Sequence, residues 1–235
     1  MTNDADLKFI KSGIKMGAPL FLSYFPIAIA FGILSKSTGL DFFQTLGFSV
    51  IVFAGASQFM AVSMIAAGSM GLEIVVATLF LNFRHFLMSS LISQRLKFKN
   101  HILKPFVGFF ITDETFSVAS FTQGLLTEKY MLAMEITAYL GWVTGTATGF
   151  ALGNILPVML QKSMAIGLYA LFISLLIPEI KKTNKAFVLA ASSGLINTLL
   201  VNVFRLQQGW SIVASIVLIS SFGVLIYEKE ERFYE

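Results

Sequence analysis

Cysteine is absent from the 235 residues, and histidine occurs only at positions 85 and 101. Without cysteine the chain can form no disulfide, thiol nucleophile or cysteine-ligated metal site. A zinc site would need carboxylates beside the two histidines. The sequence also lacks an HExxH motif, a GxSxG motif and a Walker glycine loop. We therefore predict that the chain is not an enzyme, and we expect no metal and no cofactor.

Charge is scarce as well. Charged residues make up 13% of the chain and hydrophobic residues 56%, whereas a soluble domain carries about 25% charged residues. The net charge of +4 comes from short basic clusters between apolar runs, and the sequence contains no RNA-binding or zinc-finger motif. We therefore expect the lipid bilayer, and no nucleic acid, as a partner of this chain.

Eight apolar segments fill most of the sequence, and most have the ~20-residue length of a membrane-spanning helix. None shows the alternating pattern of a barrel strand. We predict an all-α, polytopic helical membrane protein of seven or eight apolar segments, built as a single domain over residues 1–235. The segments run over 16–35, 42–72, 74–93, 105–127, 130–153, 163–178, 186–204 and 210–227.

Most lysines and arginines gather in four clusters, and such clusters usually mark the cytoplasmic side of a membrane protein. We therefore predict that the N-terminal segment 1–15, two basic loops and the C-terminal tail 228–235 are cytoplasmic. The clusters consist of Lys8, Lys11 and Lys15, of Arg95, Lys97, Lys99 and Lys104, of Lys181, Lys182 and Lys185, and of Lys229 and Arg232.

Strict alternation of spans contradicts this placement, because three simple spans would put the loop at 94–104 outside. Residues 42–72 carry no charge, and a single helix of that length would measure about 46 Å. We interpret them as two half-helices that return to the side they entered from, with one long tilted helix as the alternative. The segment at 105–127 is our candidate for a second break, as in the inverted repeats of secondary transporters.

Four ionisable side chains lie deep inside apolar segments: Arg84 and His85, then Asp113 and Glu114. Arg84 and Glu114 are each 15 residues from position 99, so we expect both pairs near the middle of a ~30 Å hydrocarbon core. Charges at that depth usually serve an ion or substrate pathway and pair with one another. We expect Arg84 to pair with Asp113 or Glu114 while the other carboxylate exchanges a proton; a purely structural ion pair is the alternative.

The candidate site combines these groups with the small and polar stretch inside 42–72. We predict an unwound break over residues 55–58, where half-helix N–H groups suit a substrate carboxylate. An intramembrane serine protease with a Ser57–His85 dyad is the rival hypothesis. The predicted substrate-binding residues are Phe53, Gly55, Ala56, Ser57, Gln58, Phe59, Asn82 and Arg84, and the predicted proton-coupling residues are Asp113, Glu114 and His85.

Glycines at positions 141, 145, 149 and 153 follow one another at a four-residue spacing. This spacing places them on one helix face and allows a neighbouring helix to approach closely, so we interpret them as packing residues. Glu135, near the start of the same segment, is a weaker candidate that we expect at an interface with water.

Four motifs resemble the AzlC family: FAGASQF at 53–59, NFRH at 82–85, TDETF at 112–116 and GWVTGT at 141–146. One departure is Met88, which stands where the family usually has tyrosine. The resemblance implies a secondary transporter of the bacterial inner membrane that exports branched-chain amino acids with the proton gradient. It also implies a small AzlD-like membrane subunit as partner. The residues themselves leave uptake open as the alternative direction.

Overall fold

The computed structural model describes residues 2–96, 98, 100–122, 126–153, 173, 176–178, 180–181 and 183–231. Most of the apolar segment predicted at 163–178, parts of both basic loops and residues 232–235 lie outside the described residues. The described part of the chain forms helices and no β-strand.

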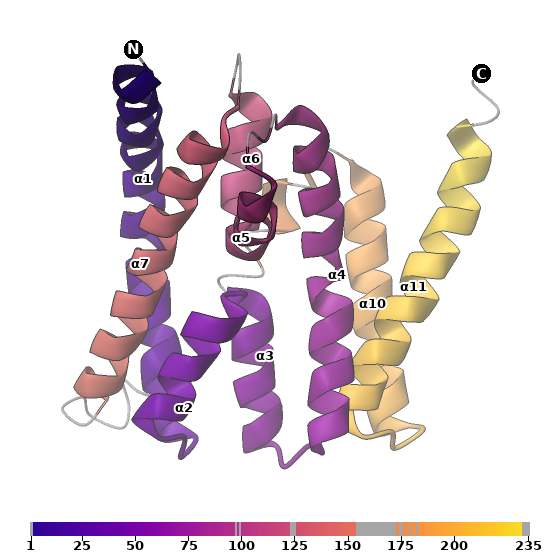
Figure 1. Ribbon diagram of the computed structural model, residues 1–235. Coiled ribbons are helices and arrows are strands. Elements are labelled where there is room, and N and C mark those ends of the chain that lie inside the picture. Colours follow the sequence, from indigo (N-terminus) through magenta and orange to yellow (C-terminus); the bar gives the residue numbers. More distant parts are fainter. Residues whose placement is uncertain are drawn as a thin grey trace. The chain divides into compact units, whose positions relative to one another are not determined.

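The helices account for the predicted all-α class (Figure 1). Among the described residues, three stretches are long and apolar enough to cross a membrane, namely Asp6–Ser37, Gly71–Arg95 and Asn184–Asn202. The elements are α1 (Thr2–Ser37), α2 (Phe42–Gly47), the π-helix η1 (Phe48–Val52), α3 (Gly55–Ala66), α4 (Gly71–Arg95), η2 (His101–Leu103), α5 (Lys104–Phe110), α6 (Asp113–Phe121), α7 (Glu128–Leu152), α10 (Asn184–Asn202) and α11 (Gln208–Glu231).

The chain divides into two compact units. The first unit contains Met1–Phe59 and Asn82–Leu168, and the second contains Met60–Leu81 and Tyr169–Glu235. All four deep ionisable residues and the predicted break at 55–58 belong to the first unit.

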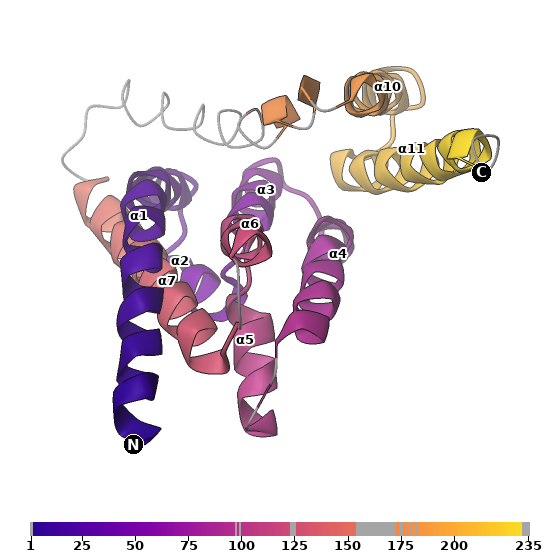
Figure 2. The same ribbon diagram turned by 90° about the horizontal axis from the view of Figure 1, so that it is seen from above.

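Helices α1 and α7 of the first unit lie side by side, as Figures 1 and 2 show. Glycines make this close contact possible: a Cβ added to Gly17 would lie 2.6 Å from the Met134 carbonyl oxygen, and one added to Gly149 would lie 2.1 Å from that of Ile29. The order of these contacts means that the two helices run parallel. The predicted packing role of the glycine series is confirmed, because Gly141 and Gly145 also meet the backbone of α1.

The first broken segment is α2–η1–α3. At its centre Phe53 has a left-handed backbone with φ of 43°, a conformation that costs a bulky residue about 1–3 kcal/mol. The break lies at Phe53 and Ala54, whereas residues 55–58 form the first turn of α3. The predicted position of the break was therefore wrong by two residues. The physical reason is that the Gln58 side chain reaches back and accepts a hydrogen bond from the Ala54 N–H (3.0 Å), which fixes the helix start just after Ala54.

Contacts with neighbouring helices give the direction of each half of this segment. The chain runs against α7 in its first half, since Phe42 packs on Phe150 and Phe53 then packs on Tyr139. It runs back along α1 in its second half, where Phe59 packs on Phe31. The segment therefore turns around inside the first unit, which confirms the predicted pair of half-helices and excludes one long helix.

The second broken segment is α5–α6. Its two halves are separated by Ile111 and Thr112, whose backbones are extended. The guanidinium of Arg95, the last residue of α4, donates to the carbonyls of Ala119, Ser120 and Thr122 at the end of α6. Because α5 begins only a short loop after Arg95, the segment enters and leaves the first unit at the same end. The predicted second break is confirmed.

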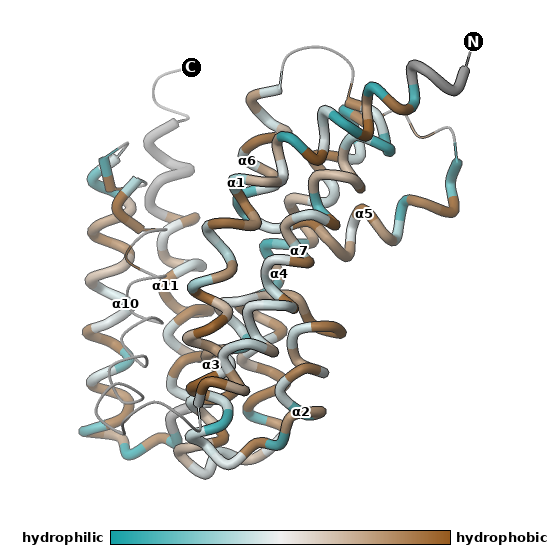
Figure 3. The backbone as a smooth tube through the Cα atoms, turned by 90° about the vertical axis from the view of Figure 1, so that its left-hand side faces the viewer, coloured by the Kyte–Doolittle hydropathy of each residue, from teal (hydrophilic) through white to brown (hydrophobic). Residues whose placement is uncertain are grey.

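The second unit contains α10, α11 and the adjoining parts of α3 and α4. Ser211 at the start of α11 donates to the side-chain oxygen of Asn197 on α10 (2.7 Å), and Gly223 packs against Leu189. Figure 3 shows hydrophobic residues along much of α10, and large apolar side chains such as Phe187 and Leu195 are exposed there. Such a surface suits contact with lipid.

Candidate functional site

The two breaks come together in the first unit around three side chains of α4. Asn82 Nδ2 donates to Ser57 Oγ at the start of α3 (3.0 Å). Arg84 Nη1 pairs with Asp113 Oδ2 at the start of α6 (2.9 Å), and His85 Nδ1 donates to the Ile111 carbonyl (3.1 Å). One turn of α4 thus contacts both breaks, and the predicted pairing of Arg84 with one of the two carboxylates is present.

Asp113 and Glu114 have different partners although they are adjacent. They form the first turn of α6, which Thr112 opens with a capping box that includes Thr115. Successive residues of a helix point about 100° apart, so Asp113 reaches Arg84 while Glu114 accepts a hydrogen bond from the Tyr24 hydroxyl of α1. Both carboxylates also lie where the helix dipole favours negative charge.

Tyr24 is the residue of this site that sequence reasoning missed. Its side chain is buried, and its hydroxyl lies 2.6 Å from Thr112 Oγ1 as well as against Glu114. Its ring packs edge-on against Phe53 (6.4 Å between centroids) and Trp142 (5.9 Å). A usable signal existed: tyrosines of membrane helices concentrate at the two interfaces, whereas Tyr24 lies in the middle of an apolar segment.

A buried chain of hydrogen bonds supports the first break. Gln58 Nε2 donates to Ser49 Oγ (3.2 Å), which lies 2.7 Å from Thr146 Oγ1 on α7. The oxygen of Gln58 also accepts from the Ala54 N–H, so this predicted substrate residue holds the break in place. Ser57 is also bonded inside the protein, because it donates to the Ala54 carbonyl (2.9 Å).

The other predicted residues of the first break are closely packed. Phe53, Ala56 and Phe59 are all buried. Gly55 lies against the Trp142 ring, where a Cβ would come within 2.7 Å of Cη2. Glycine is therefore needed at position 55 for the approach of the indole.

Three neighbouring residues of α4 keep unused hydrogen-bonding atoms. Asn82 Oδ1, Arg84 Nε and His85 Nε2 are buried and have no partner among the described residues. Buried polar atoms usually find a partner, so these atoms suit water or a small polar ligand. Together they offer one acceptor, one cationic donor and one imidazole nitrogen, which accepts in the neutral ring because the proton is on Nδ1.

The hypothetical Ser57–His85 protease dyad is not formed. Ser57 is bonded to Ala54 and Asn82, and His85 is bonded to Ile111. A nucleophile and its general base need a direct hydrogen bond, and the described residues provide none between these two. The described residues also contain no group of three His, Asp or Glu side chains that could hold a metal ion.

The position of Glu135 differs from the prediction that it lies at an interface with water. It is fully buried on α7, and both carboxylate oxygens lack a partner among the described residues. It therefore does not lie at an interface with water. The reason is the tight packing of α7, where Met131, Met134 and Ala138 around it are buried as well.

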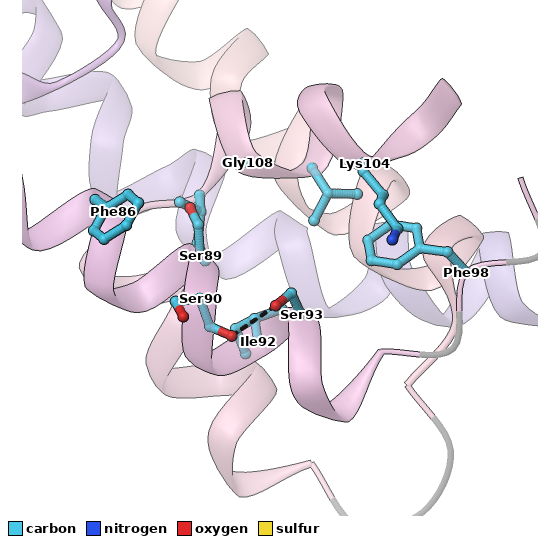
Figure 4. A pocket seen from close by; sticks show the side chains of 10 residues that line it. Phe86, Ser89, Ser90, Ile92, Ser93, Phe98, Lys104 and Gly108 are labelled. Carbon is cyan, nitrogen blue, oxygen red and sulfur yellow. Dashed lines mark hydrogen bonds between the residues drawn. The ribbon is translucent and has the colours of Figure 1, made fainter. Parts of the chain in front are cut away.

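A pocket of about 320 Å³ lies between α4 and α5 (Figure 4). Its walls are mainly apolar, and Lys104, whose ammonium group is 5.4 Å from the Phe98 ring centroid, belongs to its lining. Ile111, the first residue of the second break, also lines the pocket. The pocket therefore leads toward the site. The lining residues are Phe86, Ser89, Ser90, Ile92, Ser93, Phe98, Lys104, Val107, Gly108 and Ile111.

Met88, which replaces the tyrosine usual in the resembling family, is buried in an apolar cluster. Its neighbours in that cluster include Ile92, Ile111 and Met131. At this position the chain therefore has an apolar group close to the second break.

Comparison with known proteins agrees with these features. A membrane protein of Archaeoglobus fulgidus is 33% identical, over 78% of this chain and 80% of its own length. The inner membrane protein YgaZ of Escherichia coli K12 is 32% identical, over 77% and 78%. The branched-chain amino acid transport protein AzlC of Bacillus subtilis is 25% identical, over 79% and 73%. No solved structure matches the chain.

The relatives are membrane proteins, as the apolar helices of this chain require. The family model of the AzlC protein matches residues 19–156, a region that includes Tyr24, both breaks and the ionisable residues of the site. On this match and on the relatives that share most of its length, the chain belongs to the AzlC family.

Proposed function

We propose that this chain is a secondary transporter that exports neutral, branched-chain amino acids in exchange for protons. The observation that carries the proposal is that one turn of α4 contacts both broken helices, through Asn82–Ser57 and Arg84–Asp113, beside three polar atoms that have no partner in the described chain. Broken helices with charged side chains at membrane depth are typical of substrate sites in secondary transporters. The Bacillus relative, named as a branched-chain amino acid transport protein, supports the substrate class.

An amino acid needs a partner for each of its charged ends. Its carboxylate binds the first N–H groups of α3, at Gly55–Ser57, and receives a further hydrogen bond from Arg84 Nε. Its ammonium group donates to Asn82 Oδ1. Phe53 and Ala56 provide apolar surface for the branched side chain, while Gln58 and Phe59 hold the break in shape.

The pocket between α4 and α5 is the route to this site from one end of the first unit. Its serines offer weak polar contacts, its apolar walls accept a branched side chain, and Lys104 attracts the carboxylate. A volume of about 320 Å³ is at the lower end of the range typical of small-molecule sites.

Proton coupling uses Asp113 or Glu114, with His85 beside them. Transport takes place in the inner membrane of a bacterium, with both termini on the cytoplasmic side where the basic clusters lie. A small AzlD-like subunit completes the transporter. The export direction and the partner follow from the family resemblance.

Proteoliposomes test the proposal. Vesicles containing the purified chain, with and without the small subunit, are loaded with labelled leucine, and efflux is followed with and without an inward proton gradient. We expect gradient-dependent efflux of leucine, isoleucine and valine, and none of lysine or glutamate. Equal efflux from protein-free vesicles would refute the proposal. Movement of leucine into the vesicles under the same proton gradient would mean that the chain imports amino acids.

A further inference from the structure

Asp113 and Glu114 differ in what happens when each is protonated. Asp113 faces Arg84 at 2.9 Å, and arginine keeps its charge at all physiological pH values. Protonation of Asp113 would leave the partly buried guanidinium without its counter-ion, which is unfavourable.

Glu114 has a partner that tolerates both states. A tyrosine hydroxyl donates to a carboxylate and accepts from a carboxylic acid. The contact between Tyr24 and Glu114 can therefore persist when a proton binds, with only its direction reversed. No charge is left unpaired by this change.

The change in direction of the Tyr24–Glu114 hydrogen bond also alters the hydrogen bonds at the second break. With Glu114 ionised, Tyr24 donates to it and its oxygen can accept from Thr112. With Glu114 protonated, the hydroxyl of Tyr24 is released to donate to Thr112 Oγ1, 2.6 Å away. Thr112 is the cap of α6 and also lies 3.2 Å from the Thr115 hydroxyl, so the protonation state alters the hydrogen bonds at the start of that half-helix.

The ring of Tyr24 links the same event to the first break. It packs against Phe53, the left-handed residue of that break, and against Trp142, whose indole lies over Gly55. Tyr24 thus contacts both broken segments, the first through its ring and the second through its hydroxyl.

We infer that Glu114 is the residue that binds and releases the coupled proton, and that Tyr24 is a positioning residue that connects its protonation to both breaks. This inference rests on the proposed proton-coupled transport. Asp113 is then the fixed counter-ion of Arg84. The helices packed around Glu114 carry further ionisable side chains, among them Tyr24 on α1, Arg84 and His85 on α4, Asp113 on α6, and Glu135 and Tyr139 on α7.

Infrared difference spectroscopy tests the proton site without transport. The full-length protein in lipid is compared between acidic and alkaline buffer, where a carboxyl group that titrates produces a carbonyl stretching band. All 13 Asp and Glu residues can contribute to this absorption, so we expect one band within it to be absent in Glu114→Gln and present in Asp113→Asn. Loss of the band in Asp113→Asn, with retention in Glu114→Gln, would overturn the assignment.

Transport then tests the role of Tyr24. In leucine-loaded proteoliposomes, Glu114→Gln should lose gradient-driven flux but keep measurable leucine counterflow, which moves no net proton. Tyr24→Phe keeps the ring contacts and loses the hydroxyl, so we expect a shifted pH profile of gradient-driven flux together with a modest loss of thermal stability. An unshifted profile would refute the role of Tyr24. If the wild-type protein moves no leucine, the proposed function is contradicted. The assignment of the proton site to Glu114 is not, because the infrared experiment does not depend on transport.

Discussion

At the scale of single residues, the Arg84–Asp113 ion pair joins α4 to the second break. Its side chains are 30% and 31% exposed, so the pair is less costly to break than a fully buried one. We expect Arg84→Ala to lower stability by about 1.5–3 kcal/mol, the range for hydrogen bonds to charged groups. Thermal unfolding in detergent measures this loss.

A double-mutant cycle provides the control for this prediction. Asp113→Ala alone should be similarly damaging, and the double variant should be less destabilised than the sum of the two, because the remaining charge is then no longer unpaired. Additive losses would mean that the two side chains do not interact.

Gln58 and Gln44 are a matched pair of glutamines, since each accepts a hydrogen bond from a backbone N–H near a helix start. Gln58 is fully buried, whereas the bond of Gln44 to Asp41 is exposed. We expect Gln58→Met to cost about 1–3 kcal/mol, because the Ala54 N–H is left without a partner, and Gln44→Met to cost clearly less. A normal melting temperature with a raised KM in Gln58→Met would instead indicate direct substrate contact.

At the scale of elements, the parallel pair α1–α7 determines where the site residues lie. Tyr24 belongs to α1 and Trp142 to α7, so any separation of these helices disturbs both breaks. The two helices are in backbone contact, because a Cβ added at Gly17 or Gly149 would clash with a carbonyl oxygen of the facing helix.

Gly149→Ala tests this packing. The new methyl group would meet the Ile29 carbonyl at 2.1 Å, and overpacking of this kind typically costs about 1–3 kcal/mol. Gly194→Ala in α10 is the control, because an added Cβ there meets nothing within 4 Å. We expect a lower melting temperature in the first variant only; equal values would show that α1 and α7 can separate freely.

The pocket between α4 and α5 offers a second test at this scale. A Cβ on Gly108 would lie 3.8 Å from Ser89 Oγ, an ordinary contact, so Gly108→Ala should be tolerated. Gly108→Phe would fill the pocket, and we expect it to reduce leucine flux while the melting temperature stays close to that of Gly108→Ala. Undiminished flux in the phenylalanine variant would exclude the pocket as the substrate route.

At the scale of the whole molecule, hydrogen bonds and ion pairs define one end of the first unit. The N-terminal Asp6 pairs with Lys129 (2.5 Å), the Asn100 N–H donates to Glu128, and Arg95 holds the end of α6. The N-terminal cluster and the loop after α4 therefore lie at the same end, which the re-entrant α2–η1–α3 segment makes possible.

Cysteine labelling tests this arrangement in cells, because the native chain has no thiol of its own. Lys8→Cys and His101→Cys, both at exposed positions, should react with a membrane-impermeant reagent from the cytoplasmic side only. Ser37→Cys, at the other end of α1, should react from the outside. Labelling of positions 8 and 101 from opposite sides would contradict the re-entrant first segment.

The sequence by itself determined the all-α class, because long apolar segments in lipid must satisfy their backbone groups internally. It also determined the need for two breaks, since the basic clusters and the number of spans are incompatible without them. The pairing of Arg84 with one of two adjacent carboxylates followed from the cost of isolated charge at membrane depth.

Only the tertiary structure decided which carboxylate Arg84 takes. Adjacent helical residues point in different directions, and the rotation of α6 that separates Asp113 from Glu114 depends on how α1, α4 and α7 pack around it. The same packing buried Glu135 and brought Tyr24 to Glu114. The hydrogen bonds of Tyr24 join residues about 90 positions apart in the sequence, which no local pattern encodes.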